Sequence, residues 1–410
     1  MSMGSAGADK KRLTLFCQVF HPDDQSTAQL FSDWTAALAG RGWDIRVVCG
    51  FPPKQGSTPS PSRETWKGVE IRRVGSRFDF KRSLLRRAVH YAAYLAGVSW
   101  ELLREPERLA LVVTNPPFLP IFASLVRKLR NGRYAVEVQD LYPDGLVAVG
   151  KLADGVLARW WRRLNRFAFG GAEFTVVLGR DMRERLLSSY ALPSESVAVI
   201  PHWSPVEVDE PLAFEASDLI RRQGFEKCFV VQYSGNMGLW HDLDQIVRAA
   251  ALLQNESHIR FLMIGSGMRR AAAESLAGKE GLGNMTWLPF LPKQSLADSL
   301  SACRVALISQ REGLEGVAVP CKLYGILASG RCAIGAVPEN SETARVLDEE
   351  TCGHRVPPGD AKALADAIES LSRNPDSVVR MGVNARSAYQ RLYTLKAALD
   401  RFEKLVIQSN

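Results

Sequence analysis

The sequence predicts an α/β protein of two domains, each built on a doubly wound parallel sheet, that face each other across a central cleft. Apolar strand-like segments alternate with amphipathic helix-like segments along the whole chain, which is typical of parallel α/β sheets. The alternation runs once before and once after the proline-rich, acidic segment 201–211. A chain of 410 residues is also long for a single hydrophobic core, which favours two domains.

The first half opens with the apolar segment LTLFCQVF and an amphipathic segment at 26–42, for which Ser26 or Thr27 is a plausible helix cap. Further apolar segments continue the sheet. The predicted strands of this half are 13–20, 44–50, 69–74, 109–116, 133–140, 173–179 and 197–202. We expect an N-terminal domain over 1–205 and a hinge at about 201–211.

The second half repeats the scheme over 212–385. Its predicted strands are 228–235, 259–267, 284–290, 305–309 and 332–337, and its predicted helices are 242–254, 268–278, 293–303 and 361–373. A last amphipathic helix belongs to 386–410, and whether it crosses back to the N-terminal domain is left open. Ligands of open α/β sheets bind beyond the carboxyl ends of the strands, so the site is predicted in the cleft between the domains.

Composition limits the classes of function. No apolar run reaches the roughly 18 residues of a membrane span, and the first residues lack the apolar core of an export signal. The seven cysteines and six histidines show no metal-ligand spacing, which predicts reduced thiols in a cytoplasm and no bound metal. The net charge is +8, and residues 1–200 hold 29 Lys and Arg against 19 Asp and Glu. This asymmetry predicts an anionic partner for the first half, a membrane surface or a nucleic acid.

Glycines follow two strands of the second half. Gly235 and Gly238 lie between a strand and a helix, where backbone N–H groups can approach an anion, although a tight turn without a ligand fits equally well. The glycines of GSG, 265–267, lack the third glycine of a dinucleotide fingerprint, and we interpret them as a turn rather than an NAD site. There is no Walker Gly-Lys-Ser/Thr box.

The segment REGLEGVAVPCKLYGILASG, 311–330, lies between two apolar strands and carries the strongest signal. Glu315, Gly316 and Val317 form a turn at the end of the first strand. Lys322 then opens a helix-like run and places a full positive charge there. A lysine that only extends into solvent is the alternative. The pattern predicts a binding site for an anion such as phosphate.

These pieces resemble, in order and spacing, a family 4 glycosyltransferase of the GT-B architecture. In the second half the matching pieces are GNMG (235–238), GSG (265–267), LPF (288–290), EG and VPCK (315–322) and VPPGD (356–360). In the first half VQDLYPD (138–144) and IPHW (200–203) resemble members that build bacterial surface polysaccharides. The resemblance implies transfer of a sugar, with retention of configuration and without a metal or other cofactor, from a UDP- or GDP-sugar. It also implies that the N-terminal domain binds the acceptor and the C-terminal domain binds the donor.

The resemblance also implies a set of donor-binding residues. Those assigned to the diphosphate are Gly235, Asn236, Gly238, His241, Gly265, Gly267, Arg311, Gly316, Val317 and Lys322. Those assigned to the vicinity of the base and ribose are Phe290, Leu291 and Leu323. The family usually has Arg and Lys where this chain has Asn236 and, nearby, His241. Lys322 and Arg311 are therefore expected to carry more of the phosphate charge.

A second departure concerns the pair of glutamates that the family spaces as E-x7-E. Aligned on Ala328-Ser329-Gly330, those positions fall on Val317 and Gly325, and neither is acidic. The nearest acids are Glu312 and Glu315, and we expect Glu315 to act at the catalytic site because it lies within the turn.

The acceptor side is predicted from polar residues that follow strands of the first half. Asp140, at the end of an apolar strand, is assigned to orienting or deprotonating an acceptor hydroxyl. The loop HPDDQSTAQL contributes further polar contacts. These are Asp23, Asp24, Gln25, Ser26 and Thr27. Helix capping and turn formation explain the same residues equally well.

Two basic, aromatic stretches, 77–100 and 156–169, account for much of the positive charge. Such helices can lie in an anionic membrane interface, and core packing with a solvated basic face is the alternative. The residues expected to face the membrane are Arg86, Arg87, Trp160, Trp161, Arg162 and Arg163. No nucleic-acid recognition motif accompanies them.

The sequence therefore predicts a glycosyltransferase of the bacterial cytoplasm, bound to the inner face of the membrane, that acts on a lipid-linked glycan acceptor. Two other functions stay open. A nucleotide-sugar epimerase can share the architecture and does not need the basic, aromatic helices. An inactive homologue that serves as a binding subunit would explain the two absent glutamates.

Overall fold

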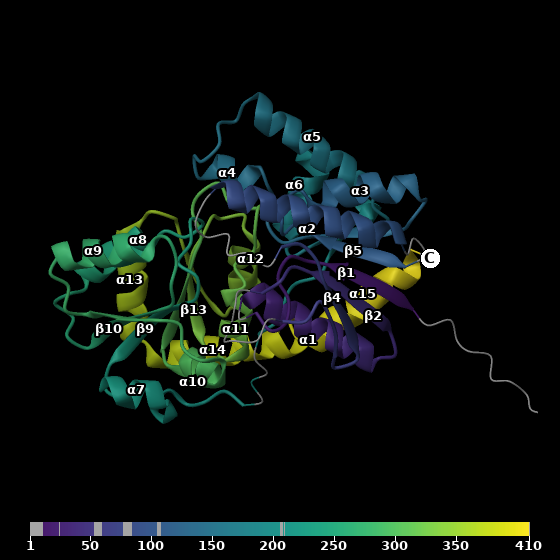
Figure 1. The fold of residues 1–410 in the computed structure, drawn as a ribbon. Coiled ribbons are helices and arrows are strands. Elements are labelled where there is room, and N and C mark those ends of the chain that lie inside the picture. The colour runs from purple at the N-terminus through teal and green to yellow at the C-terminus, as the bar shows by residue number, and fades with distance from the viewer. Residues whose placement is uncertain are drawn as a thin grey trace, which may run out of the picture.

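The computed structural model describes residues 11–23, 25–52, 60–76, 84–104, 108–205, 208 and 210–409, without the side chains of 84–88. The chain forms two α/β domains, each with one sheet between layers of helices (Figure 1). This architecture confirms the predicted fold class.

The N-terminal sheet has eight strands, all parallel to their neighbours except for one hairpin at the edge. In spatial order the strands are β3 (Arg63–Trp66), β4 (Val69–Arg73), β2 (Asp44–Cys49), β1 (Arg12–Phe16), β5 (Leu109–Val113), β6 (Tyr134–Val138), β7 (Thr175–Val177) and β8 (Val197–Val199). The hairpin strand β3 was not predicted, because its sequence, RETW, is polar and half exposed.

Alternate residues of these strands pack on opposite faces of the sheet. Leu109 and Leu111 of β5 lie in one core cluster, whereas Ala110 and Val112 lie in another. Both faces are covered, so the whole strand is buried and its sequence is continuously apolar. The helices of this domain are α1 (Ser26–Gly40), α2 (Leu84–Arg104), α3 (Leu119–Leu129), α4 (Asp144–Ala148), α5 (Val156–Gly170) and α6 (Arg180–Ser189).

The C-terminal sheet is wholly parallel. In spatial order its strands are β11 (Met285–Leu288), β10 (Ile259–Ile264), β9 (Phe229–Ser234), β12 (Val305–Ser309), β13 (Cys332–Ala336) and β14 (Gly353–Val356). The helices around it are α7 (Asp218–Gln223), α8 (Leu243–Leu252), α9 (Arg270–Lys279), α10 (Leu296–Ser301), α11 (Lys322–Ala328), α12 (Glu342–Glu349), α13 (Ala361–Ser372) and α14 (Pro375–Leu392). One core cluster contains residues of both domains, so the two domains are packed against each other.

The final helix, α15 (Leu395–Gln408), leaves the C-terminal domain and packs under the N-terminal sheet (Figure 1). The ring of Phe402 lies 4.8 Å from that of Trp34 and 6.0 Å from that of Trp43. Arg41 of α1 forms ion pairs with Asp400 and Glu403, at 2.7 and 2.6 Å. The chain therefore joins its domains twice, once through the 201–211 segment and once through the step from α14 to α15.

Phe402→Ala should destabilise the N-terminal domain by about 3–5 kcal/mol, because its side chain is only 2% exposed and its loss leaves a cavity among three aromatic rings. Denaturant unfolding measures the change. Ile407→Ala is the matched control, because that side chain, on the same helix, is 59% exposed. Equal stability of the two variants would show that α15 does not hold the N-terminal core.

Candidate active site

One loop of the C-terminal domain, residues 310–321, contacts the N-terminal domain beyond the end of strand β6. We call it the cleft loop. It follows β12, and its Ala318 forms an isolated antiparallel bridge with Asp140, which lies beyond the end of β6. The N–H of Leu141 donates to the carbonyl oxygen of Val317 over 2.9 Å. The end of β6 and the cleft loop thus form one continuous backbone surface between the domains.

Asp181, in the first turn of α6, holds the cleft loop from the N-terminal side. Its Oδ2 accepts hydrogen bonds from the N–H of Gly316 and from the N–H of Glu342, each over 3.0 Å. Burial raises the pKa of Asp181, and these backbone donors oppose that effect. Asp181 was not predicted as a functional residue. Its position after a strand, like that of Asp140, is the feature of the sequence that could have identified it.

The backbone donors of Gly316 and Val317 are therefore already used inside the protein. Gly316 donates to Asp181, and Val317 donates to the carbonyl oxygen of Leu314 over 3.1 Å. Both residues are buried, and the Val317 side chain is fully so. This corrects the expectation that their N–H groups bind phosphate, because a donor that is bonded in the core is not free for a ligand.

Glu315 lies in the middle of the cleft loop. Its carbonyl oxygen accepts a hydrogen bond from the Arg185 side chain over 2.9 Å. Its carboxylate oxygen Oε2 is buried and has no hydrogen-bond partner among the described residues. Such oxygens are rare in folded proteins, so this one is available to a ligand hydroxyl. Glu312, the other acid considered for this role, is exposed.

Asp140 presents a second carboxylate at the same place. Its backbone is fixed by Thr114, whose hydroxyl donates to the Asp140 carbonyl oxygen over 3.1 Å. Within the described residues its carboxylate has no hydrogen-bond donor as a partner. Burial raises the pKa of Asp140 to about 6, and the nearby His202 lowers it again in part. A carboxylate with this pKa is ionised at pH 7 and still basic enough to accept a proton.

Lys322 stands at the start of α11, opposite the glycine loop that follows β9. Its Nζ donates to the carbonyl oxygen of Asn236 over 3.3 Å and lies 4.6 Å from the centre of the Tyr233 ring. Burial lowers the pKa of Lys322 to about 8, while the Cys321 thiol raises it. No carboxylate pairs with this ammonium group in the described part of the chain. The ammonium group is therefore bonded only to neutral groups, which leaves its charge uncompensated among the described residues.

The glycines of the C-terminal domain bring two loops into backbone contact around Lys322. A Cβ on Gly265, where φ is +134°, would lie 2.0 Å from the carbonyl oxygen of Gly235. Gly235 itself, with a φ of +127°, would place a Cβ 3.4 Å from the Lys322 Cε. Gly267 approaches Met237 in the same way. A side chain on Gly235 would fill space beside the ammonium group, and side chains on Gly265 or Gly267 would collide with the backbone of the loop that holds Asn236.

His241 lies in the same loop but carries no positive charge. Its Nδ1 is 2.7 Å from the carbonyl oxygen of Ser309, which can only accept, so Nδ1 bears the proton. Burial first, and the Lys322 charge second, lower the pKa of His241 to about 3. Its Nε2 is therefore a hydrogen-bond acceptor. This corrects the assignment of His241 to the diphosphate, because an acceptor can bind a sugar hydroxyl but not a phosphate oxygen.

The other predicted donor residues differ in exposure. Asn236 is exposed, Gly238 is partly buried beside it, and the N–H of Arg311 donates to the carbonyl oxygen of Trp240 over 2.9 Å. Phe290 is 57% exposed on the loop after β11, and Leu291 is partly buried. Leu323 is fully buried in the core, so the structure does not place its side chain near a ribose.

Gly325, where relatives are expected to carry a glutamate, packs below the cleft. A Cβ added there would contact two methyl carbons of Leu300 at 3.4 and 3.5 Å. A longer side chain at this position would have to displace Leu300 of α10. The structure therefore offers no second carboxylate at Gly325, and Glu315 with Asp140 supplies the acids near the cleft loop.

On the N-terminal side, the first residue of α1 lies close to the residue that precedes α11. The Ser26 Oγ is 3.9 Å from the Cys321 Sγ, next to Lys322. Asp23 accepts hydrogen bonds from the backbone and side chain of Gln25, at 2.9 and 3.2 Å, and Thr27 is partly buried in the first turn. Of these predicted residues, Ser26 has a contact with the C-terminal domain, and Asp24 lies outside the described residues.

Trp240 was not predicted, and it joins the glycine loop to the N-terminal domain. A Cβ on Gly145 of α4 would lie 2.2 Å from the Trp240 ring, so the ring packs directly against the backbone of Gly145. The Tyr142 ring lies 6.1 Å from Trp240 and is stacked 6.2 Å from Trp161, which in turn stacks 4.4 Å from Phe118. The feature of the sequence that could have identified Trp240 is the presence of a tryptophan within a glycine-rich loop.

The residues expected to face a membrane do not form one set. Trp160 is 53% exposed and Arg163 is exposed. Trp161 is partly buried in the aromatic stack, and Arg162 pairs with Asp154 at 2.6 Å and with Asp144 at 3.3 Å. The ion pairs turn Arg162 toward the protein rather than toward solvent. Arg86 and Arg87 belong to α2, but their side chains lie outside the described residues.

Two further observations concern ligands and membranes. The described residues contain no group of three or more His, Cys, Asp or Glu that would suit a metal ion. None of the helices in the described ranges is both long and apolar enough to cross a bilayer.

Known families match both halves of the chain. The profile "Glycosyl transferase 4-like domain" matches residues 27–203, and the profile "Glycosyl transferases group 1" matches residues 217–388. This chain belongs to the family 4 glycosyltransferases. The family resemblance inferred from the sequence is thereby confirmed, and with it the prediction that the protein is a glycosyltransferase.

Two curated relatives span most of the chain. A probable glycosyltransferase, WbjE of Pseudomonas aeruginosa, is 29% identical over 77% of this chain and 78% of its own length. The putative colanic acid biosynthesis glycosyl transferase WcaI of Escherichia coli strain K12 is 25% identical over 76% of this chain and 79% of its own length.

Solved structures share the fold. The sucrose-phosphate synthase of Thermosynechococcus elongatus has a TM-score of 0.75 at 17% identity and covers 97% of this chain and 99% of its own. The Anabaena protein Alr3699/HepE, in complex with UDP-glucose, has a TM-score of 0.71 at 12% identity and covers 97% of this chain and 99% of its own. These likenesses establish the GT-B architecture of this glycosyltransferase.

Gly145→Ala should loosen the contact between the domains, because the added methyl group would overlap the Trp240 ring. We expect a loss of about 1–3 kcal/mol, as for other overpacked sites, measured by denaturant unfolding. Gly155→Ala is the control, because a Cβ there meets no atom within 4 Å. If Gly145→Ala were as stable as this control, the Trp240 ring would not be held against α4.

Proposed function

We propose that this protein transfers a sugar, with retention of configuration, from a UDP- or GDP-sugar to a lipid-linked glycan acceptor during the synthesis of a bacterial surface polysaccharide. The observation that carries the proposal is the unpaired ammonium group of Lys322, held beside the glycine loop at the mouth of the cleft. The names of WbjE and WcaI and the UDP-glucose bound by HepE support the class of reaction.

The diphosphate of the donor binds where Lys322 meets the loop of Gly235, Asn236 and Gly238. As the bond to the sugar breaks, negative charge grows on the leaving phosphate, and a fixed cation stabilises that charge more than the ground state. Arg311, at the start of the cleft loop, is close enough along the chain to add a second cation. No metal ion is part of this proposal, so turnover should persist in a chelator.

The sugar lies between the diphosphate and the N-terminal domain. His241 Nε2, an acceptor, takes a hydrogen bond from one sugar hydroxyl, and the buried Glu315 Oε2 takes one from another. Glu315 Oε2 is already desolvated by the fold without a hydrogen-bond partner among the described residues, so a bound sugar would supply that partner. A sugar without the matching hydroxyl would leave this oxygen unpaired, which is a source of donor specificity.

The acceptor hydroxyl approaches from the side of Asp140. Ser26 and Thr27 flank this approach from the first turn of α1, and the backbone bridge between Asp140 and Ala318 holds Asp140 beside the cleft loop. Ionised Asp140 can orient the attacking hydroxyl and receive its proton. With a pKa of about 6, it loses that capacity as the pH falls through 6. Retention itself is tested by the anomeric configuration of the product.

Two measurements separate this function from the alternatives. A transferase releases free UDP or GDP from its donor only when acceptor is present, whereas an epimerase converts the nucleotide sugar alone. An inactive homologue would bind a nucleotide sugar without turnover. A thermal-shift panel of UDP-, GDP-, ADP- and dTDP-sugars identifies the donor, and the donor that stabilises the protein is then used in the turnover assay.

Lys322→Ala should weaken nucleotide binding about 10- to 100-fold, the usual range for a hydrogen bond to a charged group. Wild-type affinity should also fall as the pH rises through about 8, because the unliganded ammonium group loses its proton there. Calorimetric titration with the nucleotide measures both effects. Lys279→Ala, at an exposed site of the same domain, is the control and should bind normally. Unchanged affinity in Lys322→Ala would exclude the proposed phosphate site.

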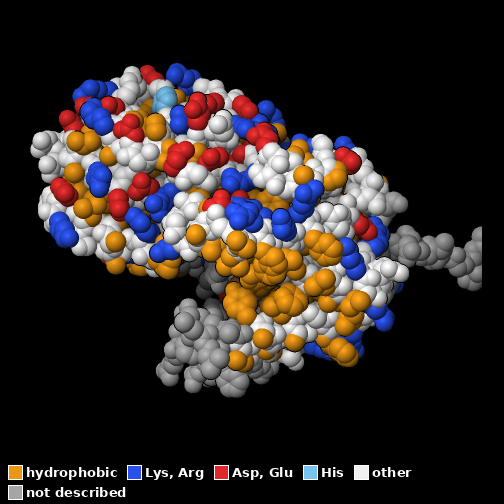
Figure 2. Space-filling view, turned by 90° about the horizontal axis from the view of Figure 1, so that it is seen from above, with side chains coloured by type: hydrophobic (Ala, Val, Ile, Leu, Met, Phe, Trp, Pro, Cys, Tyr) orange, Lys and Arg blue, Asp and Glu red, His pale blue; other side chains and the backbone are white. Residues whose placement is uncertain are grey.

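The N-terminal domain also carries an apolar face. Figure 2 shows a broad group of hydrophobic side chains, with basic groups at its margins, on one side of this domain. Within the described residues, most of the exposed large hydrophobic side chains lie on α2, α3 and α5. They are Val89, Tyr91, Trp100, Phe118, Phe122, Leu125, Leu129, Val156, Leu157, Trp160 and Phe167. We refer to these residues as the apolar face.

We propose that the apolar face rests on the inner surface of the bacterial membrane, so that a cytoplasmic enzyme reaches a lipid-linked acceptor. Large exposed apolar patches mark interaction surfaces, and the positive charge of this half of the chain suits anionic lipids. The aromatic stack from Phe118 to Trp240 connects the apolar face to the cleft.

The double variant Leu157→Asp with Trp160→Asp should bind anionic vesicles more than tenfold less tightly, because each lost apolar contact costs about 1.5–3 kcal/mol. Vesicle sedimentation measures the change. Leu252→Asp with Ile407→Asp is the matched control, since these side chains have similar exposure but lie on other helices. Equal binding by both double variants would show that the apolar face does not meet the membrane.

A further inference from the structure

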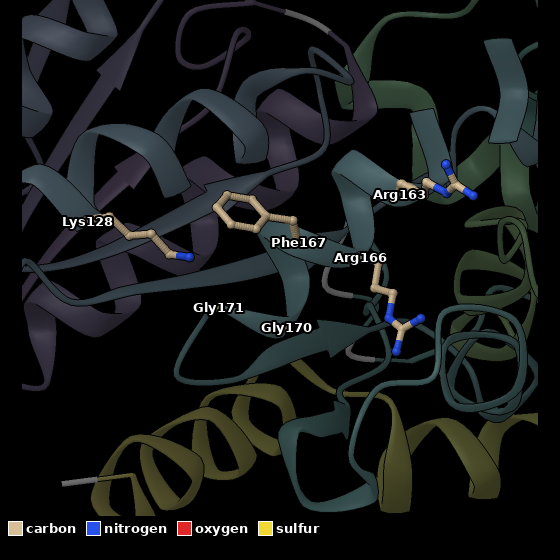
Figure 3. Close-up of a pocket in the computed structure, with 6 residues that line it drawn as sticks. All are labelled: Lys128, Arg163, Arg166, Phe167, Gly170 and Gly171. Atoms are coloured by element: carbon tan, nitrogen blue, oxygen red, sulfur yellow. The ribbon is translucent and has the colours of Figure 1, made fainter. Parts of the chain in front are cut away.

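A shallow cavity of about 440 Å³ lies where the ends of α3 and α5 meet, at the border of the apolar face. It is lined by Lys128, Arg163, Arg166, Phe167, Gly170 and Gly171. Figure 3 shows that Lys128 comes from one side, whereas the other residues belong to the last turns of α5 and the loop after it.

The three cations of this cavity have no acidic partner among the described residues. Arg162, the neighbour of Arg163 on the same helix, pairs with Asp144 and Asp154. The ammonium group of Lys128 instead lies 3.7 Å from the centre of the Phe167 ring. Arg163 and Arg166 are three residues apart on one helix, so their like charges are neighbours and repel each other. Nothing within the described chain compensates this repulsion, but a bound anion would.

The lining also leaves room for a ligand. No carboxylate contributes to it, and Gly170 and Gly171 place no side chain in it. Gly171 cannot be replaced easily, because a Cβ there would lie 2.7 Å from the Tyr134 hydroxyl. A volume of this size is in the range of small-ligand sites and exceeds that of a single phosphate group. It accommodates a phosphate together with the polar group esterified to it.

The cavity is separate from the donor site. None of the residues that line it belongs to the glycine loop after β9, the cleft loop or α11. Gly170, at the end of α5, lies eight residues beyond Arg162, which is roughly 12 Å along the helix. The exposed residues Leu129 and Phe167 border the cavity or adjoin its lining residues, and both belong to the apolar face.

We propose that this cavity binds the phosphate of a membrane phospholipid through Lys128, Arg163 and Arg166. We call the cavity the headgroup pocket. The assignment rests on the proposed contact between the apolar face and the membrane, and it adds a defined lipid chemistry to that contact. Arginine guanidinium groups bind phosphate oxygens in pairs, whereas a general electrostatic attraction makes no distinction among anions. The headgroup pocket should therefore discriminate a phosphate from another anion of equal charge.

The test compares two kinds of vesicle with the same surface potential. In one the anion is phosphatidylglycerol, and in the other it is oleate, a carboxylate, in the same phosphatidylcholine background. The wild-type protein should bind the phosphatidylglycerol vesicles at least tenfold more tightly. The triple variant Lys128→Gln, Arg163→Gln, Arg166→Gln should lose this preference. It should also lose up to about a hundredfold in affinity, since each basic residue at such a surface contributes about a factor of five.

A matched triple variant removes the same charge outside the cavity. Arg104→Gln, Lys151→Gln and Arg159→Gln lie at exposed sites of the N-terminal domain, and this variant should keep the preference for phosphatidylglycerol. Equal loss of the preference in both triple variants, or no preference in the wild type, would overturn the headgroup pocket. Either result would leave vesicle binding itself intact, so the failure is distinct from that of the apolar face.

A soluble phosphate ester is the other source of the same chemistry. Glycerol phosphate in the absence of vesicles should give no thermal stabilisation beyond that of sodium chloride at equal ionic strength. Stabilisation of the wild type, but not of the Lys128, Arg163 and Arg166 triple variant, would assign the cavity to a soluble ligand and overturn the lipid assignment. Unchanged thermal unfolding of both triple variants without ligand confirms that the comparison concerns folded protein.

Discussion

The active site depends on one hydrogen-bonding group, the buried carboxylate of Asp181. It belongs to the N-terminal domain, yet its Oδ2 accepts from Gly316 in the cleft loop and from the first residue of α12. Both donors are backbone groups that would otherwise be unsatisfied when the domains close, which is costly in a buried interface. The pairing of Leu141 with Val317 and the bridge at Ala318 extend the same contact. Because of this contact, Asp140 lies beside the cleft loop, which contains Glu315.

The positively charged side chains near this contact are of two kinds, those that pair with acids and those that do not. Arg180 pairs with Glu342 and Glu349 at 3.0 and 2.7 Å, and Arg345 pairs with Glu184 at 2.6 Å, so these cations join α6 to α12. Lys322 pairs with no acid in the described part of the chain, and its environment lowers its pKa. The paired cations hold the interface, whereas the charge of Lys322 is not compensated by an acid of the described residues. The same distinction separates Arg162 from Arg163 on α5.

Most of the fold could be predicted from the sequence, because buried parallel strands are recognisable as short, continuously apolar runs such as VALIS in β12. The position of the site stays a prediction, based on the rule that ligands of such sheets bind beyond the carboxyl ends of the strands. The polar edge strand β3 escaped prediction because it is not buried on both faces. Leu323 was assigned to the ribose because it is adjacent to Lys322 along the chain, but its side chain is fully buried in the core.

The sequence by itself determined the two-domain α/β architecture, the family and the segments that form the cleft, because these depend on local pattern and on the order of motifs. Only the tertiary structure decided which groups are free to act. Gly316 and Val317 lost their predicted role because their N–H groups are bonded in the core, and His241 became an acceptor because Ser309 fixes its proton and burial keeps it neutral. Trp240 gained a role because Gly145 lies beneath its ring. Hydrogen bonding, charge and contact across a domain interface are set by residues that lie far apart in sequence, so the local pattern does not contain them.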